Sequence, residues 1–560
     1  MLAVIGYITI IFIISLLISI ASGVKDNSEI KKRILSQWGK EPEKQYGEED
    51  ITNISKYFVN RTHHEIERFF VDEITWNDLD MDEIFKDMNS TWSTPGEECL
   101  YSILREPLFN EKELKCRNEI INFFKEYEDE RKTLQYFLAK LGKRRGLSIT
   151  DYFYNDSENR KSSLTLYRIL GSMPLVSLIL FLFNAHLAVI CLIMFFGINT
   201  AVHYIEKGKI DYKLRDFMYM IKIVRCANLI LKQNINKLKY YNGKLKSSLN
   251  SIRSIKNISF NLSSNGTDIS LMWEYANILF LRDLIKYEKM CIVLEKKSYE
   301  FKVIFQVVGT LDSYISIASY RKKLGFYTVP ELHRCNRKEE QDIEIKDIVH
   351  PLIKSGIGNS INISESILIT GSNASGKSTF LKTVAINIIF AQTICTCTAR
   401  YFKGCYFKLY TSMALKDNIF NNESYYIAET KSLKRIIDNL NVQIPTICFV
   451  DEILRGTNTV ERIAASSQVL KYLTINNCIC IAASHDVELT YILEKYFENY
   501  HFQEEISNDE ISFDYKIYNG RATTQNAIKL LGILGYDNDI VSKAEKNAVK
   551  FLQQGIWEVI

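Results

Sequence analysis

The sequence has few of the cysteine patterns that build metal or redox centres. Its twelve cysteines are scattered, with no C-x-x-C pair and no other metal-ligand spacing. The pairs Cys395/Cys397 and Cys478/Cys480 lie in runs typical of β-strands, where alternate residues share one face. We therefore expect buried, reduced thiols, which suits a cytosolic compartment.

Proline is also scarce, and none occurs between Asp211 and Leu324. Apolar residues recur there at helical spacing, which predicts long helices with an interruption around Ser259 to Asp268, where Ser, Asn and Gly are frequent. Another helix is expected to start at Pro95-Gly96 and to stop near Pro107. No repeat of 20–50 residues is evident, which excludes a solenoid.

Length and charge indicate several parts. A chain of 560 residues is too long for one compact domain, and its net charge of +4 conceals strong segregation. Residues 65–98 contain eleven acidic and two basic residues, whereas residues 203–260 contain thirteen basic and three acidic residues. The basic block predicts contact with phosphates or anionic lipid heads, although a solvated helical face is the commonest meaning of such a block.

Two apolar stretches predict membrane elements. Leu2 to Ile20 carry no charge and are about as long as one spanning helix. An uncleaved anchor is favoured over a signal peptide because no Lys or Arg precedes the run, and the basic residues after it place that side in the cytoplasm. Residues 169–202 would form a helix of roughly 50 Å, too long for a hydrocarbon core of about 30 Å, so two short helices turning at Asn184 are predicted. A re-entrant or interfacial hairpin is the alternative.

A phosphate-binding loop runs from Gly371 to Ser378 and fills every fixed position of G-x-x-x-x-G-K-S. An apolar strand-like run precedes it and a helix-like pattern follows it. Gly371 and Gly376 let the backbone curl around phosphate, Lys377 reaches the β and γ oxygens, and Ser378 offers a hydroxyl to Mg²⁺. ATP and Mg²⁺ are therefore the expected cofactors.

Two further strand-like runs end in polar residues. The first ends at Asp451 and Glu452, about seventy residues after the glycine loop, and is typical of a Walker B strand. We expect Asp451 to hold the Mg²⁺ shell and Glu452 to act as the general base on the attacking water. The second run ends at Ser484-His485, which favours a γ-phosphate contact for His485 over a buried core histidine.

These segments together resemble the ATPase domain of the MutS mismatch-repair family. The resemblance extends to Asn373 and Thr379 in the loop, to Arg455-Gly456-Thr457 after the Walker B strand, and to Glu488-Leu489-Thr490 after His485. It implies an ABC-like ATPase that works as a dimer, with each loop completed by a signature segment of the partner subunit. By position that segment is 422–429, with Ser424 as the trans γ-phosphate ligand. Residues 329–546 carry the clear resemblance, and residues 95–325 resemble the family's lever and clamp helices more faintly.

The expected fold is an α/β P-loop ATPase domain after an all-α lever and clamp region with transmembrane helices. The predicted parts are an N-terminal anchor (1–24), an acidic helical segment (25–94), a helical core and lever region (95–328) with the membrane hairpin (169–202), an ATPase domain (329–546) and a tail (547–560). The family's mismatch-reading domain has no visible counterpart. The ATPase is expected to face the cytoplasm at the cell membrane.

Three functions from different classes remain. The first is a membrane-tethered, homodimeric MutS-like ATPase that binds mismatched or branched DNA. The second is an ATP-driven membrane scaffold that binds no DNA. The third, an exporter subunit, is disfavoured because about six long spans and an LSGGQ-like segment would be needed.

Overall fold

The computed structural model describes residues 25–43, 46–144, 149–154, 162–253, 275–335, 337–372, 375–413, 425–440, 443–507, 510–522, 527–533, 535–555 and 557. The predicted anchor at 1–24 lies outside these residues. The chain divides into two compact units. The helical unit comprises Met1–Ile66, Asn89–Ser102 and Ile120–Ser319, and the sheet unit comprises Glu67–Met88, Ile103–Glu119 and Tyr320–Ile560.

This division differs from the predicted boundaries, because two early segments belong to the sheet unit. Within residues 67–88, Asp78 is buried and accepts hydrogen bonds from Thr411 Oγ1 at 2.6 Å and from the Met413 backbone N–H at 2.9 Å. The predicted acidic segment is therefore not one domain. Part of its negative charge is used to bind the edge of a β-sheet.

Helices make up the described part of the helical unit, with α5 and α6 extending across its boundary. Their bounds are α2 (Glu48–His64), α5 (Thr94–Leu104), α6 (Glu111–Glu126), α7 (Glu128–Leu141), α8 (Asp151–Tyr154), α9 (Leu164–Leu180), α10 (Ala185–Lys232), the 3₁₀ turn η1 (Asn236–Leu238), α11 (Lys239–Ser251) and α13 (Arg282–Lys323), whose last turn lies in the sheet unit. Helix α5 begins next to Pro95 and ends before Pro107, as the sequence predicts.

A buried carboxylate holds the start of α5. Asp312 on α13 accepts hydrogen bonds from Ser93 Oγ at 2.5 Å and from the backbone N–H groups of Trp92 and Ser93. Gly96 allows this approach, since a Cβ there would lie 2.1 Å from Asp312 Oδ2. Burial raises the pKa of Asp312 to about 6, although these hydrogen bonds oppose the rise.

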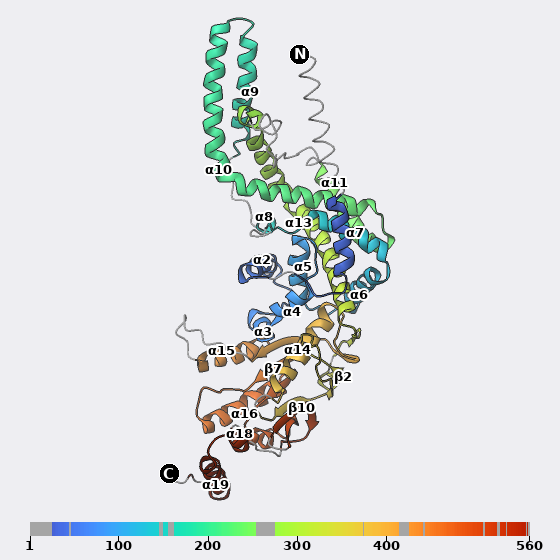
Figure 1. Cartoon of the computed structure of the whole chain (residues 1–560), viewed down its shortest axis with the longest axis vertical. Coiled ribbons are helices and arrows are strands. Elements are labelled where there is room, and N and C mark those ends of the chain that lie inside the picture. Colours follow the sequence, from blue (N-terminus) through green and yellow to red (C-terminus); the bar gives the residue numbers. More distant parts are fainter. Residues whose placement is uncertain are drawn as a thin grey trace. The chain divides into compact units, whose positions relative to one another are not determined.

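Helices α9 and α10 form an antiparallel pair whose turn is at the predicted position (Figure 1). Asn184 caps α10, because its side-chain oxygen accepts a hydrogen bond from the Leu187 N–H at 3.2 Å. The prediction of two short helices is wrong for the second arm, since α10 continues for 48 residues. Its apolar part passes without a break into the basic segment.

The apolar arms of this pair are exposed. Helices α10 and α13 are both long and apolar enough to cross a membrane, but only 11% of the apolar window is buried in α10, against 78% in α13. Helix α13 therefore resembles a core helix of the unit. The exposed large apolar residues of α9, α10 and their turn include Leu175, Leu178, Ile179, Phe181, Leu182, Phe183, Ile190, Ile193 and Phe196.

The helical pattern expected to continue past residue 232 is broken. Helix α10 ends at Lys232, Asn234 adopts a left-handed φ of 47°, and η1 leads into α11. Asparagine tolerates this conformation better than most residues, so it supports a turn that apolar periodicity does not reveal. The interruption predicted around 259–268 lies outside the described residues.

Two sheets and their helices form the sheet unit. The six-stranded sheet has the order β10-β9-β4-β8-β7-β6, in which only the β10–β9 pair is antiparallel, and the four-stranded sheet has the order β1-β5-β2-β3. The strands are β1 (Glu331–His333), β2 (Ile343–Ile348), β3 (Asn359–Ile363), β4 (Ser366–Thr370), β5 (Tyr401–Cys405), β6 (Lys408–Ser412), β7 (Thr446–Asp451), β8 (Cys478–Ala483), β9 (Phe497–Ser507) and β10 (Glu510–Asn519). The helices are α3 (Glu73–Asp78), α4 (Met81–Met88), α14 (Lys377–Thr393), α15 (Tyr425–Asp438), α16 (Thr459–Ile475), α17 (Val487–Ile492), α18 (Ala527–Ile533) and α19 (Asn538–Gln554), with the 3₁₀ turn η3 (Lys338–Glu340). Helix α19 passes through the predicted boundary at 546/547.

The cysteine predictions hold only in part. Cys478 and Cys480 are buried on β8, as expected, and share one hydrophobic cluster. Cys395 and Cys397 are buried but lie in the turn after α14, where Cys395 has a φ of 51°. The expectation of buried, reduced thiols does not hold for Cys335 and Cys405, which a disulfide joins in this structure.

Candidate functional site: a phosphate loop at the ends of three strands

The glycine loop joins β4 to α14 at the carboxyl edge of the six-stranded sheet. Gly371 has a φ of +145°, and a Cβ there would lie 2.6 Å from the carbonyl oxygen of Phe502. Gly376 has a φ of +108° and precedes the first turn of α14. Both positions therefore require glycine, and the loop leads into a helix N-terminus that favours anions. Asn373 lies outside the described residues.

Lys377 folds back over this loop. Its Nζ donates hydrogen bonds to the carbonyl oxygens of Gly371 at 2.8 Å and of Ser372 at 2.7 Å. Burial lowers the pKa of Lys377, while the nearby carboxylates, first Glu452 and then Asp451, oppose that change. The ammonium group of Lys377 is therefore partly buried, and nearby negative charge offsets the cost of burying it.

Asp451 ends β7 beside the first turn of α14. Burial raises the pKa of Asp451, and a hydrogen bond with the Ser378 side chain opposes the rise. Its Oδ1 atom is buried without a hydrogen-bond partner among the described residues. A buried carboxylate oxygen of this kind beside a serine hydroxyl fits the oxygen ligands that Mg²⁺ prefers. Ser378 and Thr379 are exposed at the start of α14.

Glu452 has a strained backbone conformation, and its carboxylate contacts the side chains of His485 and Arg455. Its φ is +54°, and its backbone N–H donates to the Ala483 carbonyl oxygen at 2.9 Å, which fixes the turn. Oε1 lies 3.0 Å from His485 Nε2, and Oε2 lies 2.5 Å from Arg455 Nε. Burial raises the pKa of Glu452, but His485 and Arg455 together outweigh that effect, so the net pKa is lowered.

His485 reaches Glu452 because β8 is tied to its neighbours on both sides. The Ser484 backbone N–H donates to the Ile369 carbonyl oxygen of β4 at 3.0 Å. After His485, Asp486 receives two hydrogen bonds from the Arg462 guanidinium, at 2.9 and 2.6 Å. This bidentate pair holds the segment that carries His485 against α16.

A cavity of about 440 Å³ opens beside the loop. Gly376, Lys377, Ser378, Thr379 and Glu452 from the predicted site line it. The rest of its lining includes Ile348, His350, Ile353, Ile357, Asn359, Phe502 and Tyr515, which sequence reasoning does not place at the site. The sequence offers a signal for His350, because Val349-His350-Pro351 upstream of the glycine loop also resembles the MutS ATPase domain.

Two of these additional residues determine the character of the cavity wall: His350 is uncharged, and Asn359 holds a neighbouring strand in place. Burial, together with the positive charge of Lys382, lowers the pKa of His350 to about 4, so the imidazole is neutral at pH 7. Asn359 holds β10 in place, because its Nδ2 donates to the Tyr515 carbonyl oxygen and its Oδ1 accepts from the Ile517 N–H, both at 2.9 Å. The cavity thus combines a phosphate loop with an apolar wall.

The predicted trans segment is described only from Tyr425, so Ser424 lies outside the described residues. Glu429 of the same segment is buried and accepts hydrogen bonds from the backbone N–H groups of Leu454 and Arg455. Burial raises the pKa of Glu429, and these hydrogen bonds oppose the rise. Within one chain, α15 therefore supports the turn that carries Glu452.

The structure thus brings Lys377, Ser378, Asp451, Glu452 and His485 together at the ends of β4, β7 and β8. A glycine loop between a buried strand and a helix, with an acidic pair at the end of another parallel strand of the same sheet, defines a P-loop nucleotide-binding domain. The individual roles of these residues stay predictions.

Comparison with known proteins agrees with this class. Residues 367–552 match the family model described as MutS domain V, which is an ATPase-type α/β domain. The chain is 24% identical over 271 residues to a DNA mismatch repair protein MutS of Fervidobacterium nodosum, covering 46% of this chain and 32% of that protein. It is 27% identical over 281 residues to the MutS protein of Rickettsia bellii, covering 47% and 31% respectively. It is 27% identical over 333 residues to the DNA mismatch repair protein MSH3 of Debaryomyces hansenii, covering 54% and 32%.

These similarities support membership in the MutS family. They span about a third of the length of the relatives (31–32%), and the family model covers the residues of the glycine loop and of the acidic pair.

Proposed function

We propose that this protein is a MutS-like ATPase that binds ATP and Mg²⁺ in the cavity beside Gly371–Ser378 and converts ATP and water into ADP and phosphate. The observation that carries the proposal is the convergence of Lys377, Asp451 and Glu452 on one glycine loop. The amide groups of the loop and Lys377 bind the phosphates. Ser378 and Asp451 would hold Mg²⁺, which neutralises charge on the phosphate oxygens.

Glu452 is the general base in this proposal. Its lowered pKa keeps the carboxylate ionised at neutral pH, so it can orient a water molecule and accept its proton. His485 holds one carboxylate oxygen of Glu452 at 3.0 Å, and in this proposal it contacts the γ-phosphate once that hydrogen bond is released. Ser424 of a partner subunit would complete the site in a homodimer.

The proposed DNA partner is supported by a basic face on the helical unit. Arg215, Lys222, Arg225 and Lys232 follow one another at seven, three and seven residues, so they share one face of α10, and all four are exposed. Asp216 is the one carboxylate in residues 212–253, and it is buried in an ion pair with Arg144. Such a face suits the phosphate backbone of a duplex. Because Lys and Arg neutralise phosphate charges there, the affinity for DNA should fall strongly as the salt concentration rises.

The proposed membrane attachment uses the same helix pair. The apolar part of α10 has a mean hydropathy of 2.1 over its most apolar window, and that window is 11% buried. An exposed apolar surface of this size on a helical hairpin is costly in water and suits a bilayer. We propose that the hairpin inserts into the cell membrane and that the ATPase domain faces the cytoplasm.

The test of ATP binding is Lys377→Ala, with Lys434→Ala as the matched control. Lys434 is exposed on α15 and pairs with Asp438 one turn away. We expect the Lys377 variant to lose measurable binding of ATP and Mg²⁺ in a titration with the detergent-solubilised protein, and the control to bind like wild type. Wild-type affinity in the Lys377 variant would contradict the proposal.

A second candidate is an ATP-driven membrane scaffold that binds no DNA, which the exposed apolar hairpin next to the basic face favours. The variant Lys222→Gln/Arg225→Gln separates the two, with Lys289→Gln/Lys296→Gln on the exposed face of α13 as the control. Loss of DNA binding alone supports the first function. Loss of binding to anionic liposomes, with no DNA binding in wild type, supports the scaffold.

A further inference from the structure

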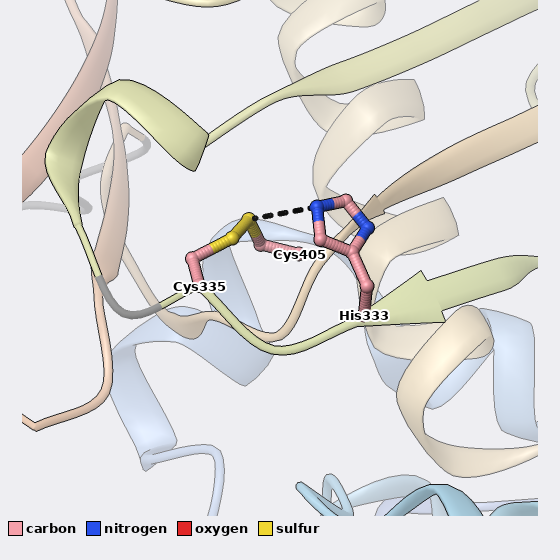
Figure 2. Close-up of side chains that lie close together, drawn as sticks. All are labelled: His333, Cys335 and Cys405. Atoms are coloured by element: carbon pink, nitrogen blue, oxygen red, sulfur yellow. Dashed lines mark hydrogen bonds between the residues drawn. A yellow bond between two sulfur atoms is a disulfide. The ribbon is translucent and has the colours of Figure 1, made fainter.

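A cluster of metal-binding side chains lies on the four-stranded sheet, outside the cavity beside the glycine loop (Figure 2). The donor atoms of His333, Cys335 and Cys405 all lie within 4.8 Å of one another. His333 and Cys335 are two residues apart, whereas Cys405 lies 70 residues after Cys335, so the fold brings Cys405 to the other two. The sequence shows none of the spacings that indicate a metal centre.

The backbone explains why His333 and Cys405 meet. Strands β1 and β5 are parallel, and His333 and Cys405 are direct register partners, so their side chains share one face of the sheet. The Tyr406 N–H donates to the His333 carbonyl oxygen at 3.2 Å, which continues the ladder past the pair. Cys335 follows His333 by two residues, and its sulfur is bonded to that of Cys405 beside the imidazole of His333 (Figure 2).

A fourth donor is placed by the neighbouring strand. Asp342 precedes β2, and the Cys405 backbone N–H donates to its carbonyl oxygen at 3.1 Å. The Asp342 side-chain atom Oδ1 lies 3.0 Å from His333 Nε2. The same imidazole nitrogen lies 3.7 Å from Cys405 Sγ. The imidazole of His333 therefore lies between the carboxylate of Asp342 and the sulfur of Cys405.

The 3.7 Å between His333 Nε2 and Cys405 Sγ matches an edge of a tetrahedral zinc site, whereas the 3.0 Å between His333 Nε2 and Asp342 Oδ1 is that of a direct contact without an ion between them. With zinc–nitrogen and zinc–oxygen bonds of about 2.0–2.2 Å and zinc–sulfur bonds of about 2.3 Å, neighbouring donors are about 3.3–3.8 Å apart. Two thiolates, one imidazole and one carboxylate also make a donor set that suits zinc better than magnesium or calcium, which prefer oxygen. Four protein ligands fill the coordination, which is typical of structural rather than catalytic zinc.

We propose that His333, Cys335, Cys405 and Asp342 form a structural zinc site in the reduced protein, and that the disulfide is the oxidised form of the same two thiols. The ten other cysteines are free, so the disulfide is isolated in a thiol-rich chain. Two equivalents of a small thiol reductant convert the disulfide to two thiols while they form their own disulfide. Zinc then replaces the two thiol protons, which are released to solvent.

The zinc site clips the segment between β1 and β2 onto β5. His333 and Asp342 are 37% and 36% exposed, so the ion can enter without unfolding of the sheet. The site is independent of the proposed nucleotide chemistry, and ATP affinity is therefore a separate readout.

The test measures zinc in the full-length, detergent-solubilised protein purified under a reducing agent without chelator and then supplied with Zn²⁺ alone. We expect one zinc per chain in wild type and in Cys116→Ser, a control at an exposed free cysteine, and less than a tenth of that in Cys405→Ser and His333→Ala. Substitution with Co²⁺ should give a thiolate-to-cobalt charge-transfer band that Cys405→Ser lacks. If Cys405→Ser fails to fold, Asp342→Asn provides the milder variant, with weakened zinc affinity and unchanged ATP affinity.

Absence of zinc from the reduced wild type would overturn the proposal. So would equal zinc content in wild type and His333→Ala, because zinc would then be held elsewhere. Free thiols can be alkylated in intact cells before lysis, and mass spectrometry then identifies the unmodified cysteines. If Cys335 and Cys405 both stayed unmodified, their disulfide would be permanent in the cell and the zinc site would be ruled out.

Discussion

Replacement of Glu452 by Gln separates hydrolysis of ATP from its binding. The change is isosteric, so the strained turn and the hydrogen bond from its backbone N–H to Ala483 are expected to persist. One side-chain oxygen can still accept from either His485 or Arg455. The amide cannot accept a proton from water at neutral pH, so only the chemical step loses its base.

The magnitude follows from the contribution of a positioned general base. Proton transfer by such a group contributes about 10²–10⁴ in rate, which is about 3–5 kcal/mol of activation free energy. We therefore expect kcat for ATP to fall by that factor. The Kd for ATP should change by less than about threefold, because the phosphate contacts of Lys377 are unaffected.

The assay is single-turnover hydrolysis of ATP with excess protein, together with a separate binding titration. Glu461→Gln is the matched control, because Glu461 is an exposed carboxylate in the first turn of α16 whose side chain accepts a hydrogen bond from the nearby Thr457 Oγ1 at 3.1 Å. Turnover by Glu452→Gln at the wild-type rate would refute the assignment of the base. A parallel loss of ATP binding would instead indicate that the turn had collapsed.

Three further predictions concern stability, measured by urea unfolding followed by circular dichroism. Gly96→Ala should destabilise the protein by about 1–3 kcal/mol, because its Cβ would collide with Asp312; a neutral effect would contradict the packing. The pKa of Asp312 is raised to about 6 in the folded state, so its protonated form stabilises the fold by up to about 3 kcal/mol below about pH 3.8, and this contribution is lost as the pH rises through about 6. Asp312→Asn should remove this pH dependence. If the free energy of unfolding of the variant and of wild type changed with pH in the same way, the prediction would be refuted. Arg321→Met should lower the free energy of unfolding by about 2–4 kcal/mol, because the buried guanidinium donates to the carbonyl oxygens of Ile394 and Cys395 at 3.1 and 2.8 Å. Wild-type stability in this variant would show that the two carbonyl oxygens find other donors.

The nucleotide site is largely predictable from sequence because its chemistry is local. The loop, the acidic pair and His485 each lie within a few residues of a buried strand's end, and parallel strands bring those ends together. The turn at Asn184 is predictable for a similar reason, since a polar residue in an apolar run also caps the next helix. Local patterns thus place these residues without knowledge of distant contacts.

Contacts between distant segments escape this reasoning. The hydrogen bond from Thr411 to Asp78 joins residues 333 positions apart, so charge alone cannot reveal that the acidic segment belongs partly to the sheet unit. Cys335 and Cys405 are 70 positions apart and meet only through the pairing of β1 with β5. The apolar wall of the nucleotide cavity is missed for the same reason, because Phe502 and Tyr515 come from strands far along the chain.

In the proposed function the protein binds both ATP and DNA, and we expect ATP binding to control DNA binding. The most direct measurement titrates Glu452→Gln protein, held with ATP and Mg²⁺, against homoduplex, mismatched and branched DNA at two salt concentrations. We expect DNA binding that requires nucleotide, weakens steeply with salt, and is lost in Lys222→Gln/Arg225→Gln. Absence of binding to all three DNAs at low salt would contradict it and would leave an ATPase that acts at the membrane alone.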